Sequence, residues 1–148
     1  MEIARQIQVS LLPIEAPELA GLDIAGFSQS ARHVGGDFYN YFVFSQTQLG
    51  IAVGDVSGKG IQASLMMALA FGLLTNQVRH NIAPADLLAE MNLLIYPHTS
   101  RTRLNTALCY LTLERIGQVW QARVANAGLI APALGYQARA MKIGLSFL

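Results

Sequence analysis

Apolar side chains recur at helical spacing near the start of the chain and again in its middle. Ile3, Ile7 and Leu11 are four residues apart and Pro13 follows them, which predicts a short helix over residues 2–11. Residues 61–79 are apolar nearly all round, which predicts a helix that is buried on most of its sides.

A third helix is expected from Pro84 to about residue 96. Pro84 and Asp86 are typical of a first helical turn, and the apolar residues that follow form a single face. Because proline lacks a backbone N–H and disfavours a helical residue before it, Pro97 is expected to end this helix.

The remaining apolar segments have the spacing and composition of strands. A weak alternation predicts a strand over residues 22–31, while residues 38–44 and 49–54 are dense in aromatic and aliphatic side chains. Residues 105–113 and 118–125 are expected to pair as a hairpin across Gly117. Since the strands come in hairpins, we expect an α+β fold with antiparallel sheet and helices outside it. The apolar tail, residues 131–148, predicts no particular element.

The hairpin of residues 38–44 and 49–54 brings two carboxylates together. Its odd-numbered positions form an apolar face on both strands, and these faces coincide if the loop is centred on Gln46. In that register Tyr39 faces Val53, and Asp37 faces Asp55 with their Cβ atoms about 5 Å apart. Opposed carboxylates repel unless one is protonated or a cation lies between them, so a divalent cation with oxygen ligands is one interpretation. The alternative is two solvated aspartates at strand ends.

Composition and charge exclude several kinds of binding partner and site. Hydrophobic residues make up 53% of the 148 residues and charged residues 13%, against about 25% charged in a typical soluble domain. A net charge of +1 gives no electrostatic reason to expect binding to nucleic acid or to an anionic membrane surface. A single cysteine, Cys109, excludes an internal disulfide and a cysteine-based zinc site. We expect a cytoplasmic protein without a membrane span, because no secretory signal is visible and the apolar stretch 61–74 is short for a span.

The glycine-rich loop of residues 54–60 does not match the Walker phosphate-binding pattern. Three residues separate Gly54 from Gly58, and Gly60 stands where a serine or threonine is required. Because the loop precedes a predicted helix, its amides could still favour an anion, although Lys59 is better interpreted as a solvated side chain.

Several segments together resemble the catalytic domain of the SpoIIE/RsbU-type serine/threonine phosphatases, a bacterial branch of the metal-dependent 2C-like phosphatases. The segments are ARQIQVSLLP at 4–13, VGGDFYN at 34–40, DVSGKG at 55–60, NTALCYLTLE at 105–114 and ANAG at 125–128. The resemblance implies two antiparallel sheets packed as a sandwich and flanked by helices. It also implies an N-terminal linker or regulatory helix over residues 1–13 and a phosphatase domain over residues 14–148.

The resemblance implies a site and a reaction as well. Asp55 matches the residue that bridges two Mn²⁺ or Mg²⁺ ions, Val56 matches the position whose backbone carbonyl binds one of them, and Asp37 matches the residue that holds metal-bound water. The implied reaction is attack of metal-activated water on phosphoserine or phosphothreonine. The implied partners are a phosphorylated protein like an anti-sigma-factor antagonist, in sigma-factor partner switching, and an upstream sensor domain.

The chain departs from the family pattern at three places. Asn40 and Leu129 stand where the family usually has aspartate and histidine, and no Asp or Glu follows Glu114. We therefore expect a domain that is incomplete at its C-terminal end, with a weak or empty metal site and poor turnover. The alternative to an enzyme is a non-catalytic, phosphatase-like binding or regulatory module. An uncovered sheet edge and the apolar stripe of residues 2–11 further predict a homo-oligomer.

Overall fold

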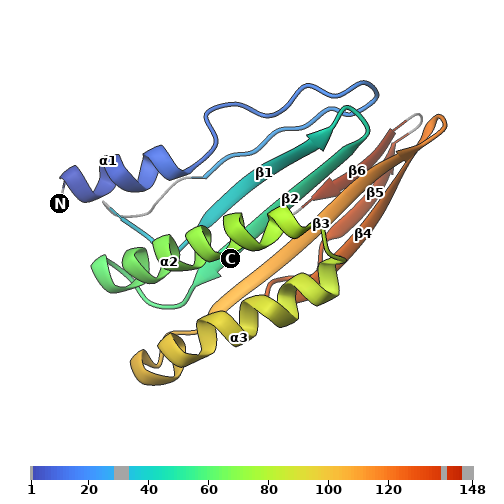
Figure 1. Ribbon diagram of the computed structural model, residues 1–148. Helices are drawn as coiled ribbons and strands as arrows, with labels where there is room; N and C mark the ends of the chain where they lie inside the picture. Colours follow the sequence, from blue (N-terminus) through green and yellow to red (C-terminus); the bar gives the residue numbers. More distant parts are fainter. Residues whose placement is uncertain (1, 29–33, 138–139, 145–148) are drawn as a thin grey trace.

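A four-stranded antiparallel sheet in the order β1-β2-β3-β4 is the centre of the molecule (Figure 1). The computed structural model describes residues 2–28, 34–137 and 140–144. Its elements are α1 (Glu2–Leu11), β1 (Phe38–Ser45), β2 (Gln48–Val56), α2 (Ile61–Gln77), a 3-10 turn (Val78–His80), α3 (Pro84–Thr102), β3 (Thr106–Ile116), β4 (Val119–Ala127), β5 (Ala133–Gln137) and β6 (Ala140–Gly144). The last two strands form a separate antiparallel pair, so the predicted α+β class with antiparallel sheet and flanking helices is confirmed.

Helices α2 and α3 cover one face of this sheet (Figure 1). The even-numbered side chains of β1, β2 and β3 point toward them, and Phe38 packs edge-on against Phe71 of α2 with ring centroids 5.9 Å apart. Gly54 lies under the Phe38 ring, and a Cβ there would collide with it. The larger hydrophobic core therefore lies between the helices and the sheet.

The opposite face of the sheet is covered by the chain that follows α1. Leu19, Leu22 and Ile24 pack on the odd-numbered apolar residues of β2 and β3. The indole N–H of Trp120 on β4 donates to the Ala20 carbonyl oxygen at 3.2 Å, which fixes the segment across the sheet. Side chains on the odd face, including the predicted carboxylate pair, thus lie on the side away from α2 and α3.

The predicted strand over residues 22–31 is wrong for its described part. Residues 22–28 are irregular, and residues 29–31 lie outside the described residues. The weak alternation is real, because Leu22 and Ile24 are half-buried while Asp23 and Ala25 are exposed. The segment therefore lies on the face of the sheet through its side chains, without a strand partner among the described residues.

The predicted end of the third helix at residue 96 is also wrong. Helix α3 continues through Pro97 to Thr102. Proline removes the hydrogen bond to the carbonyl of the residue four positions earlier, Leu93, which is 67% exposed and open to water. The Thr99 hydroxyl, in the turn after Pro97, donates to the carbonyl oxygens of Ile95 and Tyr96.

Helix α2 is buried on one face, not on most of its sides as predicted. Its buried residues are Ala63, Met66, Met67, Ala70, Phe71 and Leu74, whereas Ile61 and Leu65 are more than half exposed. The helices form a single layer over the sheet, so the outer face of α2 lacks a covering element among the described residues. The helical stretch Ile61–His80 is 20 residues long, and an 18-residue window within it has a mean hydropathy of 1.3, which meets the length and composition of a membrane-crossing helix; 39% of that window is buried inside the molecule.

Candidate functional site

The β1–β2 hairpin places Asp37 and Asp55 side by side. The predicted register of this hairpin is confirmed in three pairs, Tyr39 with Val53, Tyr41 with Ile51 and Val43 with Leu49. Asp37 directly precedes β1 and Asp55 is the penultimate residue of β2, so the same register sets them opposite one another. The two side chains are close enough for Asp55 to raise the pKa of the Asp37 carboxyl.

The turn that sets this register differs from the predicted loop. Gln46 and Thr47 form a two-residue turn, and the strand register shifts between Val43 and Ser45. The Ser45 hydroxyl accepts a hydrogen bond from the Thr47 backbone N–H at 3.1 Å, as a short polar side chain commonly does in a turn. The shift is confined to the end of the hairpin distant from the aspartates, so it leaves their alignment unchanged.

The Asp37 carboxyl is protonated more readily than an ordinary aspartate. Partial burial is the largest cause, followed by the hydrogen bond and the negative charge of Asp55, and together they raise the pKa of Asp37 from 3.8 to about 6. Both causes that involve Asp55 arise from two carboxylates in one small space. Such a pair shares a proton or a cation.

Val56 adds a backbone oxygen next to the carboxylate pair. Its N–H donates to the Gly36 carbonyl at 3.2 Å, and a Cβ at position 36 would collide with the Val56 carbonyl oxygen. Glycine at this position lets the segment that holds Asp37 approach the end of β2. The structure therefore brings the three predicted positions, Asp37, Asp55 and Val56, to one place.

The loop between β2 and α2 continues directly from these residues. Ser57 extends the pairing of β2 with β3, because its N–H donates to the Asn105 carbonyl at 2.8 Å and its hydroxyl accepts from the Asn105 N–H at 2.7 Å. Gly58 and Gly60 have φ values of 97° and 76°, a region that favours glycine. Lys59 is exposed, as expected for a solvated loop lysine.

The residues present fit a divalent cation that is partly coordinated by water. Two carboxylates and a carbonyl oxygen are hard donors of the kind that Mg²⁺ and Mn²⁺ prefer. They leave several positions of an octahedral shell to other ligands. Within residues 2–28, 34–137 and 140–144, no group of three or more His, Cys, Asp or Glu side chains is arranged to hold a metal ion.

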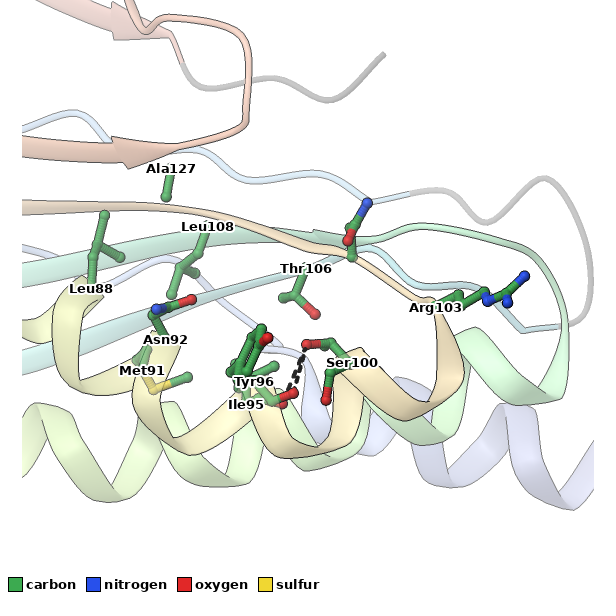
Figure 2. Close-up of a pocket in the computed structure, with 12 residues that line it drawn as sticks. Leu88, Met91, Asn92, Ile95, Tyr96, Ser100, Arg103, Thr106, Leu108 and Ala127 are labelled. Atoms are coloured by element: carbon green, nitrogen blue, oxygen red, sulfur yellow. Dashed lines mark hydrogen bonds between the residues drawn. The ribbon is translucent and has the colours of Figure 1, made fainter.

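A pocket that the sequence analysis did not predict lies on the other face of the sheet (Figure 2). It has a volume of about 470 Å³ and is lined by residues of α3 and of strands β3 and β4, including Tyr96, Arg103 and Thr106. The Thr106 hydroxyl oxygen is buried there without a hydrogen-bond partner. Because Thr106 pairs with the buried core residue Val56, the pocket is on the helix side of the sheet and is separate from the aspartates.

Sequence reasoning also missed Gln8 of α1. Its side chain is only 7% exposed and forms two hydrogen bonds with the backbone of Gly35, two residues before Asp37. The predicted apolar stripe of this helix instead points largely to solvent, since Ile3 is 72% and Ile7 59% exposed. Apolar spacing does not reveal a buried amide, so the pattern gave no signal for Gln8.

Comparisons with known proteins place the chain in a family. The model of the family described as Stage II sporulation protein E (SpoIIE) matches residues 45–142, a segment that contains Asp55 and Val56 and begins after Asp37. The chain is 35% identical over 92 residues to the phosphoserine phosphatase RsbU of Bacillus subtilis, which covers 62% of this chain and 27% of RsbU. It is 42% identical over 74 residues to Protein IcfG of Synechocystis, which covers 50% of this chain and 12% of IcfG.

A solved structure shares the fold. The crystal structure of the RsbU and RsbW domains of Rv1364c from Mycobacterium tuberculosis matches with a TM-score of 0.56 over 72% of this chain and 28% of that chain, at 20% sequence identity. The chain therefore spans less than a third of the length of each of these relatives. The family match covers most of the elements described above, from the end of β1 to β6, and on this basis the chain belongs to the SpoIIE family.

Proposed function

We propose that this chain is the phosphatase module of a metal-dependent protein phosphatase that hydrolyses phosphoserine or phosphothreonine in bacterial signalling. The observation that supports the proposal most directly is the Asp37–Asp55 pair at the open end of the β1–β2 hairpin, in a chain of the SpoIIE family. Relatives of known function point the same way, because RsbU is a phosphoserine phosphatase.

In this proposal each residue has a distinct role. Asp55 and the Val56 carbonyl oxygen hold Mn²⁺ or Mg²⁺, and Asp37 orients a water molecule next to them. A divalent ion held there would lower the pKa of water and neutralise charge on the phosphoryl oxygens. A cation next to the pair would favour the ionised form of Asp37.

We further propose the context in which the module acts. The substrate is a phosphorylated protein like an anti-sigma-factor antagonist in a partner-switching system, and the protein works in the cytoplasm. Residues 1–13 form a linker or regulatory helix after an upstream sensor domain, and residues 14–148 belong to the phosphatase domain. The family match and the RsbU and RsbW domains that occur together in Rv1364c support this context.

A phosphate-release assay tests the proposed activity. The chain is incubated with a phosphoserine peptide and Mn²⁺, and the same reaction is run with excess chelator, with Asp55→Asn and with Asp86→Asn, an exposed aspartate on α3. Release that needs Mn²⁺ and falls at least about 100-fold in Asp55→Asn, but not in Asp86→Asn, supports the phosphatase. Release that is equal in Asp55→Asn and unmodified protein contradicts it.

A second function has one observation in its favour. Since no group of three or more metal-ligating side chains is found in the described part of the chain, the module would bind ions weakly and serve as a non-catalytic regulatory domain. Mn²⁺ binding that weakens in Asp55→Asn, with no phosphate release by the unmodified chain, would favour this alternative.

A further inference from the structure

Gln8 is the one buried residue of α1, although it is polar. Its exposed fraction is 7%, while Gln6, Ile7 and Val9 beside it are exposed. Burial of an amide side chain is unfavourable unless its donor and acceptor are both paired. The surroundings of Gln8 must therefore supply both partners.

Both partners come from a single residue, Gly35. The Gln8 Nε2 donates to the Gly35 carbonyl oxygen at 2.6 Å, and the Gly35 N–H donates to Gln8 Oε1 at 3.0 Å. The amide thus pairs with the two polar groups of one backbone residue, as a neighbouring strand residue would. This contact joins positions 27 residues apart in the sequence.

The Gln8 contact lies directly next to the candidate site. After Gly35, the Gly36 carbonyl accepts from the Val56 N–H at 3.2 Å, and Asp37 comes next. The backbone before Asp37 is therefore held by α1 at one residue and by β2 at the following residue. With both ends of this short segment fixed, the Asp37 carboxylate has a defined position relative to Asp55.

We propose that Gln8 is a positioning residue that sets Asp37 opposite Asp55 by holding the Gly35 backbone. This inference rests on the proposed function, since fixed carboxylates matter because they bind an ion. It adds a residue of α1, outside the segment that matches the family model, to the support of the site. A displacement of α1 would therefore be transmitted from Gln8 to Asp37 through Gly35 and Gly36.

The test compares the same change at two glutamines of one helix. Gln8→Met keeps the length and burial of the side chain but removes both hydrogen bonds, and Gln6→Met is the matched control at an exposed position. Mn²⁺ affinity is measured by titration calorimetry, and amide hydrogen exchange in the metal-free protein is followed residue by residue. Circular dichroism establishes that each variant is folded.

We expect Gln8→Met to weaken Mn²⁺ binding roughly tenfold, the size typical of residues that orient metal ligands. The amides of Gly35 and Val56, which donate to Gln8 Oε1 and to the Gly36 carbonyl, should exchange at least about tenfold faster, because the opening of this segment then costs less free energy. Gln6→Met should change neither quantity. Equal Mn²⁺ affinity in Gln8→Met and the unmodified protein would overturn the proposal.

Two further outcomes are distinguishable. If Gln8→Met does not fold, Gln8→Asn, which is too short to keep both hydrogen bonds, is tested in the same way, and unfolding of both variants would assign Gln8 to fold stability and overturn the positioning role. If the unmodified protein binds no Mn²⁺, the proposed phosphatase function fails. The exchange rate of the Val56 amide, which donates to the Gly36 carbonyl, then decides the inference about Gln8: faster exchange in Gln8→Met supports it and an unchanged rate overturns it.

Discussion

At the scale of single residues, the candidate site depends on atoms brought unusually close together. Two carboxyl groups lie next to one another, and a glycine lets the backbone before Asp37 approach the Val56 carbonyl oxygen. Each of these close approaches affects the free energy of unfolding. Substitutions at Asp37 and Gly36 measure that effect.

The stability of the metal-free protein should depend on pH through Asp37. Its pKa is raised to about 6 in the folded state, with burial as the largest cause, so folding favours the protonated carboxyl. The contribution of Asp37 is then fully present below pH 3.8 and is lost as the pH rises through 6. In chelator, the free energy of unfolding should fall between pH 4 and pH 7 relative to that of Asp37→Asn, by an amount on the order of 1 kcal/mol after solvent screening.

Urea unfolding of both proteins at a series of pH values measures this difference. Asp37→Asn is the control, because it keeps the shape of the side chain and does not titrate. A constant difference across the series would show that the pKa of Asp37 is not raised in the folded state.

Gly36→Ala should destabilise the protein, because a Cβ at position 36 collides with the backbone carbonyl oxygen of Val56. Backbone cannot move aside cheaply, so we expect a loss of about 1–3 kcal/mol in the free energy of unfolding. Gly72→Ala is the matched control, since a Cβ there meets nothing within 4 Å on helix α2. It should stabilise the protein by about 0.5–1 kcal/mol, because alanine is the better helix former. Equal effects of the two changes in thermal unfolding would contradict the assigned contact.

At the scale of elements, the alternation of apolar and polar residues along the strands predicted the structure better than single residues expected to end a helix. The β1–β2 register follows from matching two apolar faces, and that match alone brought Asp37 to Asp55. The helix end predicted from Pro97 was wrong, because proline is tolerated where the carbonyl that loses its hydrogen bond faces solvent. The sequence does not reveal which way that carbonyl faces. Strands β5 and β6 were missed, since the tail has no clear alternation, and Gln8 was missed because its partner lies 27 residues away.

Pro97→Ala should stabilise helix α3, which at present tolerates a proline in its interior. The change restores a backbone N–H opposite the Leu93 carbonyl and removes the clash of the ring with that turn. Interior proline costs about 3 kcal/mol relative to alanine, so a gain of about 1–3 kcal/mol is expected at this exposed position. Differential scanning calorimetry measures it, with His98→Ala at the next exposed position as the control. A melting temperature that does not rise would show that α3 has already adapted to the proline.

At the scale of the whole molecule, two apolar surfaces are uncovered by the described residues. One is the stripe of Ile3 and Ile7 on α1, and the other is the outer face of α2 with Ile61 and Leu65. Exposed apolar patches of this kind are typical of surfaces that bind another protein. They are consistent with the homo-oligomer that the sequence predicts.

Light scattering across a dilution series should give a mass above that of one 16.0 kDa chain, falling as the protein is diluted. Ile7→Glu should shift the distribution to the monomer by placing a charge in the α1 stripe. Leu65→Glu tests the α2 face in the same way and shows which surface is used. A concentration-independent monomer mass for the unmodified chain would exclude self-association through either surface.

The order of strands in the sheet has a consequence for how the chain folds. Strands β1 and β2 are joined by a two-residue turn, and β3 and β4 by an equally short one, whereas β2 and β3 pair across the whole of α2 and α3. Local hairpins close quickly, and a pairing that must wait for a long intervening loop is slow. The β1–β2 and β3–β4 hairpins should therefore form early. The pairing of β2 with β3 should come late and limit the rate of folding. Asp37 and Asp55 lie at the open end of the β1–β2 hairpin, so they are expected to meet before β2 pairs with β3.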